Sequence, residues 1–448
     1  MGMKHILFTA SWLTVSVALL ILAATGLAAG ATYNVIYRFQ GGTDGAIPAA
    51  PLIADQAGNL YGTTQTGGSS KNCYQGCGTV FRFKPPAKKG GVWKKTILHS
   101  FDGTDGSTPF LAPLIFDQAG NLYGTAGNIV FQLSPPKKGS GEWTETVLYT
   151  FTNGNDGGQP NGVIFDRAGN LYGSTQTGGQ YGQQGAGTIF ELTLTKNVWS
   201  ETTLYSFQQV GDGNQPGVLV FDSKGNLYGT NKGDSVTCTP KYPFRCGDVF
   251  ELMAPARKGG AWEYAVIHTF QGFNDASYPS FSGVVFDPSG NLYGTTEGTG
   301  GTGNINFEDS EGTVFELKPP AAGSGSWTET FLHDFPRPGG IDGSYAIGSV
   351  VFDESGNVYG VTFRGAGHTK ALCVYEGCGI AFELKAPGTK GGPWKEVILH
   401  AFTDGNDGAA PTSALLLGQG GALFGTTAFG GGSTACLDGC GTVFEIVP

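Results

Sequence analysis

The sequence predicts an all-β protein built from seven copies of one four-stranded unit. A phrase close to "NLYGT" recurs, with its central Tyr or Phe at positions 61, 123, 172, 228, 293, 359 and 424. The copies are roughly 50 to 65 residues apart, enough for four short strands and their turns. Gly contributes 76 of 448 residues and charged residues only 14%, which is typical of short strands joined by tight turns. Because one such unit cannot bury both of its faces alone, we expect a seven-bladed β-propeller.

The N-terminal segment is set apart from this fold. Residues 1–31 combine a basic start at Lys4, an apolar run and the small-x-small ending Ala29-Gly30-Ala31, a pattern typical of a signal peptide. The apolar run is also long enough to cross a bilayer as an uncleaved anchor, and this alternative stays open. We expect a signal peptide at 1–31 and a single propeller domain at 32–448, secreted or held at the cell surface, with no membrane span after cleavage.

Each unit contains four predicted strands. The first is an apolar run ending in Asp, such as "GVLVFD" at 217–222. A Gly-Asn turn leads into the second strand, "NLYGT", and a variable Gly-rich loop precedes the third, "GTVFEL". The fourth begins with Trp, as in "WTETVLYTF" at 143–151. Alternation in that strand predicts one shared face for Trp143, Val147, Tyr149 and Phe151.

One fourth strand is supplied by the N-terminus. Six strands begin with Trp, whereas the repeat predicts seven blades. The segment Tyr33 to Phe39 has the same alternating pattern and leads into the same "DG" turn. We expect it to complete the last blade, whose other strands come from residues 412–446, because joining both ends in one sheet removes an open edge.

The phrase "GNLYGTT…GG…GTVFEL" resembles the GloVer tandem repeat of exported bacterial "choice-of-anchor" proteins. The resemblance covers essentially the whole chain after the signal segment. It implies an extracellular or cell-surface location. It implies no activity, substrate or catalytic residue.

Residues that recur at one phase of the repeat are expected to maintain the blade. The fourth strand has a slot that holds either His or Tyr, for which packing is the favoured interpretation and a catalytic or metal-binding role of its His residues the alternative. An Asp precedes each "xxGN" turn and is expected to cap it, and the Glu of "FEL" is expected to be solvated or to form a cross-strand pair. The slot contains Tyr37, His99, Tyr149, Tyr205, His268, His333 and His400; the turn residues are Asp55, Asp117, Asp166, Asp222, Asp287 and Asp353; the glutamates are Glu191, Glu251, Glu316, Glu383 and Glu445.

A second aspartate series precedes Gly between blades. Turn formation is the favoured interpretation and calcium binding the alternative, although the spacing does not match an EF-hand. We therefore predict no cofactor, with calcium kept as the second option. The series comprises Asp44, Asp105, Asp156, Asp212, Asp342 and Asp407, with Asp275 as an imperfect member.

The eight cysteines fall into four close pairs, each within one loop between the second and third strands. Zinc would need four ligands from separate loops, whereas paired cysteines in an exported protein favour disulfides. The predicted disulfides are Cys73 with Cys77, Cys238 with Cys246, Cys373 with Cys378, and Cys436 with Cys440.

The same loops supply the candidate binding residues. They are about 15 to 20 residues long except in blade two, where about five residues remain, and irregular loops on a rigid scaffold commonly carry function. Exposed aromatics such as Tyr74, Tyr181 and Phe429 would suit stacking on sugars. The ligand-binding candidates are Asp234, Arg245, Glu297, Glu308, Arg364, His368 and Tyr375.

These features predict a monomeric binding module for a glycan or a surface protein. The alternative is a glycosidase or lyase acting on extracellular polysaccharide, which would need two unrepeated carboxylates or a base beside a cation. His368 is the one unrepeated His after residue 31, so the sequence favours binding over catalysis. A net charge of -10 argues against nucleic acid as the partner.

Overall fold

The computed structural model describes residues 30–448 except 89, 138–140, 182–184, 209–211, 234–245, 258, 273–275, 282, 299–309, 322–324, 337–341, 367–376 and 390. The predicted signal peptide lies outside the described residues apart from its last two positions. Residues 31–448 form one unit by their contacts. Within the described part of the chain, no helix is long and apolar enough to cross a membrane.

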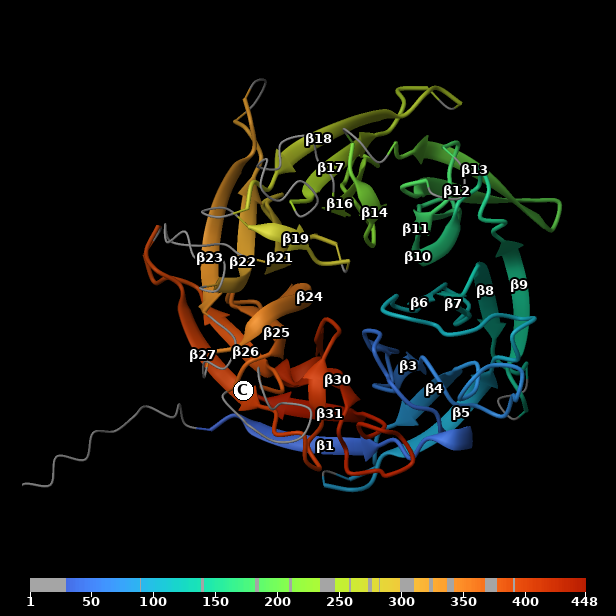
Figure 1. Cartoon of the computed structure of the whole chain (residues 1–448), viewed down its shortest axis with the longest axis vertical. Helices are drawn as coiled ribbons and strands as arrows, with labels where there is room; N and C mark the ends of the chain where they lie inside the picture. The colour runs from blue at the N-terminus through green and yellow to red at the C-terminus, as the bar shows by residue number, and fades with distance from the viewer. Residues whose placement is uncertain are drawn as a thin grey trace, which may run out of the picture. The chain divides into compact units, whose positions relative to one another are not determined.

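The described residues of that unit form a ring of seven antiparallel sheets, as the repeat predicts (Figure 1). Each sheet is a blade with four strand positions, and in blades four, five and seven the innermost position is divided between two short strands. Blade one comprises β2 (Ile53–Ala54), β3 (Leu60–Thr64), β4 (Thr79–Lys84) and β5 (Lys94–Ser100); blade two comprises β6 (Ile115–Phe116), β7 (Leu122–Ala126), β8 (Ile129–Ser134) and β9 (Thr144–Thr150); blade three comprises β10 (Gly158–Phe165), β11 (Leu171–Thr177), β12 (Thr188–Thr195) and β13 (Val198–Ser206).

The next three blades repeat this order. Blade four comprises β14 (Asn214–Pro216), β15 (Val220–Phe221), β16 (Leu227–Gly233), β17 (Asp248–Met253) and β18 (Glu263–Thr269); blade five comprises β19 (Ser277–Pro279), β20 (Val285–Phe286), β21 (Leu292–Gly298), β22 (Ser310–Lys318) and β23 (Thr328–Pro336); blade six comprises β24 (Ser344–Phe352), β25 (Val358–Arg364), β26 (Ile380–Lys385) and β27 (Lys395–Ala401).

Blade seven is closed by the N-terminal strand, which confirms the prediction. It contains β28 (Ala409–Pro411), β29 (Leu416–Leu417), β30 (Leu423–Phe429) and β31 (Thr442–Val447), with β1 (Thr32–Arg38) as its outermost strand. The register of β1 against β31 runs from Thr32 opposite Val447 to Arg38 opposite Thr442. Phe39, directly after β1, is fully buried in a cluster with Phe81 and Cys440. Both ends of the unit are therefore tied into one sheet.

The first strand of a blade begins earlier than the sequence predicts. Residues that read as an inter-blade loop pair with the second strand: Asn214 lies opposite Gly233 and Pro216 opposite Asn231. In blades four, five and seven this segment is a separate short strand, whereas β10 and β24 are continuous. The last blade accordingly starts at Ala409 and not at residue 412. Loop residues are thus part of the strand nearest the ring's axis (Figure 1).

The Gly of the "LYG" phrase is required by an aromatic ring on the next strand. A Cβ added to Gly294 would lie 2.6 Å from Cζ of Phe315, which is fully buried. The same Gly and Phe face each other in every blade, so a side chain at the Gly would collide with the core. The pairs are Gly62–Phe81, Gly124–Phe131, Gly173–Phe190, Gly229–Phe250, Gly294–Phe315, Gly360–Phe382 and Gly425–Phe444.

The fourth strands contain a β-bulge that the alternation did not predict. In blade two, Val147 lies opposite Phe131 and Tyr149 opposite Val130, so the register shifts between them. A bulge exchanges the two faces of a strand beyond it. Val147 packs in the cluster shared with blade one, whereas Tyr149 packs in the cluster shared with blade three. The prediction that Trp143, Val147, Tyr149 and Phe151 share one face is therefore wrong after Val147.

Candidate functional site

The first aspartate series caps turns, as predicted. Oδ1 of Asp55 accepts hydrogen bonds from the backbone N–H groups of Ala57 and Asn59, at 3.0 and 2.9 Å. Its Oδ2 accepts one from the Asn59 side chain at 2.7 Å. The same bonds recur at Asp117, Asp166, Asp222, Asp287 and Asp353.

The Glu of the "FEL" phrase forms the predicted cross-strand pair. Glu191 lies opposite Tyr172 in the register, and the Tyr172 hydroxyl donates to Glu191 Oε1 at 2.7 Å. Glu251 and Glu316 accept from Tyr228 and Tyr293 at 2.6 and 2.7 Å. These glutamates therefore support the blade.

The His-or-Tyr slot and the second aspartate series are two halves of one contact between blades. The Tyr37 hydroxyl donates to Asp44 at 2.8 Å, and His99 Nε2 lies 2.9 Å from Asp105. Each Asp also accepts a backbone N–H in its loop, from Gln40 and Asp102 respectively, which confirms the turn role. Equivalent contacts join Tyr149 to Asp156, Tyr205 to Asp212 and His400 to Asp407; Asp275 lies outside the described residues.

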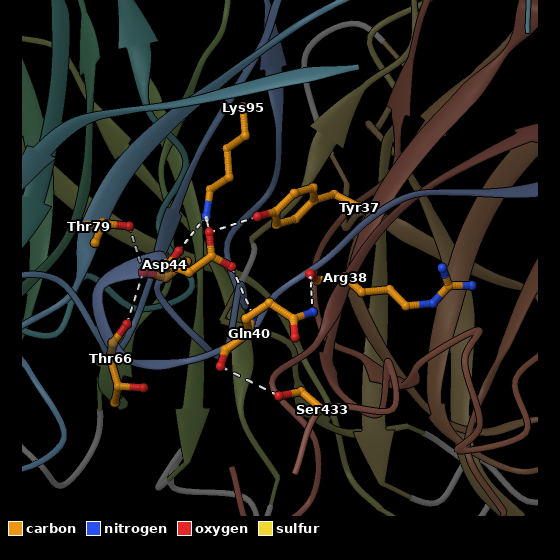
Figure 2. A network of polar contacts seen from close by, with 9 residues as sticks. Tyr37, Arg38, Gln40, Asp44, Thr66, Thr79, Lys95 and Ser433 are labelled. Carbon is orange, nitrogen blue, oxygen red and sulfur yellow. Dashed lines mark hydrogen bonds and ion pairs between the residues drawn. The ribbon is translucent and has the colours of Figure 1, made fainter. Parts of the chain in front are cut away.

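A third residue completes this contact from the next blade. It stands two positions after the Trp of the fourth strand, or at the equivalent position of β1. Between blades seven and one it is Lys95, whose Nζ lies 2.8 Å from Asp44 Oδ1 and 4.2 Å from the Phe39 ring centroid (Figure 2). Burial lowers the pKa of Lys95, and the hydrogen bond to Asp44 opposes that shift. At the other interfaces the residue is Glu145, Glu201, Tyr264, Glu329, Glu396 or Tyr33.

Between blades five and six, the three members are His333, Asp342 and Glu396. Nε2 of His333 lies 3.9 Å from Asp342 Oδ2 and 3.8 Å from Glu396 Oε2. All three potential ligand atoms lie within 4.8 Å of one another. Burial and the neighbouring Asp342 raise the pKa of Glu396 to about 9. Among the described residues, His333, Asp342 and Glu396 form a group that could hold a metal ion.

Most of the predicted ligand-binding residues lie outside the described residues: Asp234, Arg245, Glu308, His368 and Tyr375. The two that are described each contact a charged or aromatic neighbour. Glu297 pairs with Lys232 at 2.8 Å, and the guanidinium of Arg364 lies 4.5 Å from the Tyr345 ring centroid. Of the loop aromatics that would suit stacking on sugars, Tyr74 is 91% exposed and Tyr181 is 47% exposed.

Two of the four predicted disulfides are seen in full: Cys73–Cys77 and Cys436–Cys440. Cys246 and Cys378 are also disulfide-bonded; their predicted partners Cys238 and Cys373 lie outside the described residues. Each of these two disulfides includes a Cys whose backbone carbonyl accepts a hydrogen bond from the next blade. The Cys77 carbonyl accepts from the Thr108 N–H at 2.7 Å, and the Cys440 carbonyl accepts from the Ile47 N–H at 3.1 Å.

One repeated position in each inter-blade segment adopts a left-handed backbone conformation that the sequence did not reveal. Its φ lies between 45° and 58° in all seven blades, a region that residues other than Gly seldom adopt. The conformation directs its N–H to the preceding blade. In blade three the acceptor of Gln159 is the side-chain carbonyl of Asn128, at 2.9 Å, in the short loop of blade two. The seven are Ile47, Thr108, Gln159, Gln215, Tyr278, Tyr345 and Ala410.

A pocket of about 390 Å³ lies beside that short loop and is lined by residues of blades one to three. Five of its lining residues carry amides, one from blade one, one from blade two and three from blade three. Gln176 Nε2 donates to Asn161 Oδ1, and Asn161 Nδ2 donates to the Pro216 carbonyl, both at 2.6 Å. Phe110 contributes a ring that is 46% exposed. The amide residues are Gln65, Asn128, Gln159, Asn161 and Gln176.

This amide pocket contains no ionisable side chain among its described lining residues. Its remaining walls are Ser107, Thr108, Thr125, Gly127 and Pro160. The sequence did not indicate this pocket, because its lining side chains are uncharged and several of them stand at positions that recur from blade to blade.

The profile of a family described as the Gloeobacter/Verrucomicrobia repeat matches residues 127–375, more than half of the chain. The chain belongs to this repeat family. The match confirms the GloVer resemblance, and a family defined by a repeat accounts for the recurring turn, Gly and slot positions above. No curated protein matches the sequence.

Solved structures share the fold at low identity. A catalytically inactive virginiamycin B lyase from Staphylococcus aureus with quinupristin aligns with a TM-score of 0.53 and 12% identity, covering 93% of this chain and 99% of that one. The extracellular domain of a one-component system from B. thetaiotaomicron aligns with a TM-score of 0.52 and 14% identity, covering 93% of this chain and 41% of that one. A PQQ-bound aldose sugar dehydrogenase from Streptomyces coelicolor reaches 0.43 at 13% identity, covering 94% and 98%.

Proposed function

We propose that the GloVer-repeat propeller is an extracellular binding module that holds an uncharged glycan in its amide pocket. The observation that carries this proposal is the lining: five amide side chains, an exposed Phe and no ionisable side chain among the described residues. Amides both donate and accept hydrogen bonds, as sugar hydroxyls do. A ligand with many hydroxyls and no charge satisfies such a lining without leaving a buried charge unpaired.

The pocket is organised before a ligand arrives. The bonds from Gln176 to Asn161 and from Asn161 to the Pro216 carbonyl fix the orientation of two amides. Asn161 is only 7% exposed, so its rotamer is also held by packing. Polar groups whose orientation is already set lose less conformational entropy on binding. Phe110 adds an apolar surface for the face of a sugar ring.

Binding is favoured over catalysis by the same lining. Glycoside hydrolysis uses two carboxyl groups, and elimination uses a base. The described walls of the pocket offer neither. The disulfides support an oxidising, extracellular compartment for this activity.

A glycan array probed with the chain from residue 32, followed by calorimetry on an array hit, tests the proposal. Phe110→Ala should weaken binding about tenfold, equivalent to ~1.4 kcal/mol, because stacking on the ring is lost. Tyr74→Ala is the matched control, since Tyr74 is exposed and does not line the pocket.

Two results would overturn the assignment. One is a hit whose affinity falls with Tyr74→Ala and not with Phe110→Ala. The other is an array on which only charged polysaccharides bind and Phe110→Ala has no effect.

A further inference from the structure

Three metal-ligand side chains meet between blades five and six, apart from the amide pocket. His333 comes from β23, Asp342 from the segment before β24, and Glu396 from β27. Their side chains are 20%, 35% and 11% exposed. The ligand atoms therefore come from three separate segments and two blades and gather within 4.8 Å in a largely buried place.

The separations show that no direct hydrogen bond joins His333 to either acid. The imidazole nitrogen lies 3.9 Å from Asp342 and 3.8 Å from Glu396, beyond hydrogen-bond range. The corresponding His–Asp distances at two sister interfaces are 2.9 Å for His99–Asp105 and 3.1 Å for His400–Asp407. Blade five thus holds the same pair nearly an ångström further apart.

Two of these buried polar atoms have no hydrogen-bond partner among the described residues: His333 Nε2 and Glu396 Oε1. Leaving buried polar atoms unpaired is costly. An ion bound by the three side chains would give the His333 nitrogen the partner that it lacks.

The interface between blades seven and one shows what kind of group this place accepts. Lys95 stands there at the position equivalent to Glu396, and its ammonium lies 2.8 Å from Asp44, the counterpart of Asp342. Figure 2 shows that the Lys95 ammonium and the Tyr37 hydroxyl both bond to the Asp44 carboxylate. At that interface one of the three positions therefore carries a positive charge beside the Asp. Between blades five and six the equivalent side chains are an imidazole and two carboxylic acids.

We infer that His333, Asp342 and Glu396 bind a divalent transition-metal ion of the zinc class. One imidazole nitrogen and two carboxylate oxygens are ordinary zinc ligands. Bonds of about 2.0–2.2 Å put two ligands of a tetrahedral ion about 3.3–3.6 Å apart, so the observed separations need to close by only a few tenths of an ångström. Calcium is less suitable, because it takes oxygen ligands.

The ion would connect the outermost strands of two adjacent blades. Its ligands on β23 and β27 are not joined by backbone pairing, because these strands belong to different sheets. Asp342 is partly exposed and leaves the site open to solvent, so water can complete the coordination. An ion bound only by the folded chain stabilises it by mass action.

The test uses the chain from residue 32, stripped with a chelator and reloaded with ZnCl₂ or CoCl₂. Bound metal after gel filtration, the visible absorption of Co²⁺ and the melting temperature are measured. Glu396→Gln removes one ligand. The matched control is Glu145→Gln, at the equivalent position beside His99, where the His–Asp hydrogen bond is intact. Asp342→Asn, in a partly exposed loop, is a second variant in case Glu396→Gln does not fold.

We expect about one equivalent of metal in the wild type and in Glu145→Gln, and less than about a tenth of that in Glu396→Gln or Asp342→Asn. The rise in melting temperature on loading should be lost with the metal. Failure of the wild type to bind either ion overturns the assignment, and so does full loading of the folded Glu396→Gln or Asp342→Asn variant. Glycan binding by the metal-free chain separates this result from that of the amide pocket.

Discussion

Removal of the closing strand should take away much of the ring's stability. The perturbation is deletion of residues 32–40, with Phe39→Ala as its mildest form. Phe39 is fully buried and its ring centroid lies 5.3 Å from that of Phe81. Truncating a buried Phe costs about 3–5 kcal/mol. The deletion also removes the Tyr33 ring, stacked 3.6 Å from that of His400, and the whole β1–β31 ladder.

The expected loss is therefore at least about 4 kcal/mol for the deletion, a large share of the ~5–15 kcal/mol by which domains are stable. Urea denaturation measures it, with Phe110→Ala as the control because Phe110 is 46% exposed; that variant should stay within about 0.5 kcal/mol of the wild type. Deletion also exposes the edge of β31, so gel filtration should show association. A truncated chain that is monomeric and as stable as the intact one would refute the closure argument.

Two further predictions concern the blades. Gly294→Ala should destabilise the protein by about 1–3 kcal/mol, because the new methyl group meets the Phe315 ring. Gly388→Ala, where an added Cβ would have no atom within 4 Å, should be neutral in the same denaturation assay. Equal effects of the two substitutions would contradict the packing explanation. Burial and the carboxylates of Asp105 and Asp102 raise the pKa of Glu145 to about 7, so the fold favours the protonated acid and the stability it contributes below its ordinary pKa is lost as the pH rises through 7. Glu145→Gln should therefore be about as stable as the wild type at pH 4 and more stable than the wild type by about 1 kcal/mol at pH 8, since the ~3 kcal/mol implied by the pKa shift is reduced by solvent screening. A wild type that gains stability relative to the variant between pH 4 and pH 8 would contradict this prediction.

The blades and their closure were predictable because local patterns determine them. The turn aspartates bond to residues two and four positions away, and β1 carries the same alternation as the other fourth strands. The bulge at Leu148 was not predictable, since a single inserted residue leaves the apolar pattern readable in either register. The first half of the innermost strand was missed for a similar reason: its Gly and Pro residues are typical of loops.

The candidate sites were harder to predict because their members are far apart in the chain. Lys95 contacts Asp44 across 51 residues and a blade boundary. The sequence showed His333, Asp342 and Glu396 as members of repeated series, and repetition argued for a structural role. It could not show that one interface separates its His and Asp while two other described interfaces, His99–Asp105 and His400–Asp407, hold them in hydrogen bonds. That distinction depends on packing between blades.

The repeat varies its side chains at positions whose backbone is constant. The left-handed residue of each inter-blade segment has nearly the same φ in every blade, so the backbone presents its side chain in the same way each time. The side chain is an amide at Gln159 and Gln215, a phenol at Tyr278 and Tyr345, and aliphatic at Ile47 and Ala410. A strained conformation is kept only where the surrounding structure requires it, and here the bond to the preceding blade supplies that requirement. Because the backbone bears the structural role, the side chain is free to differ, and each sector of the ring can present a different chemistry. The amide pocket is the sector where Gln159 and Thr108 coincide with the shortest loop.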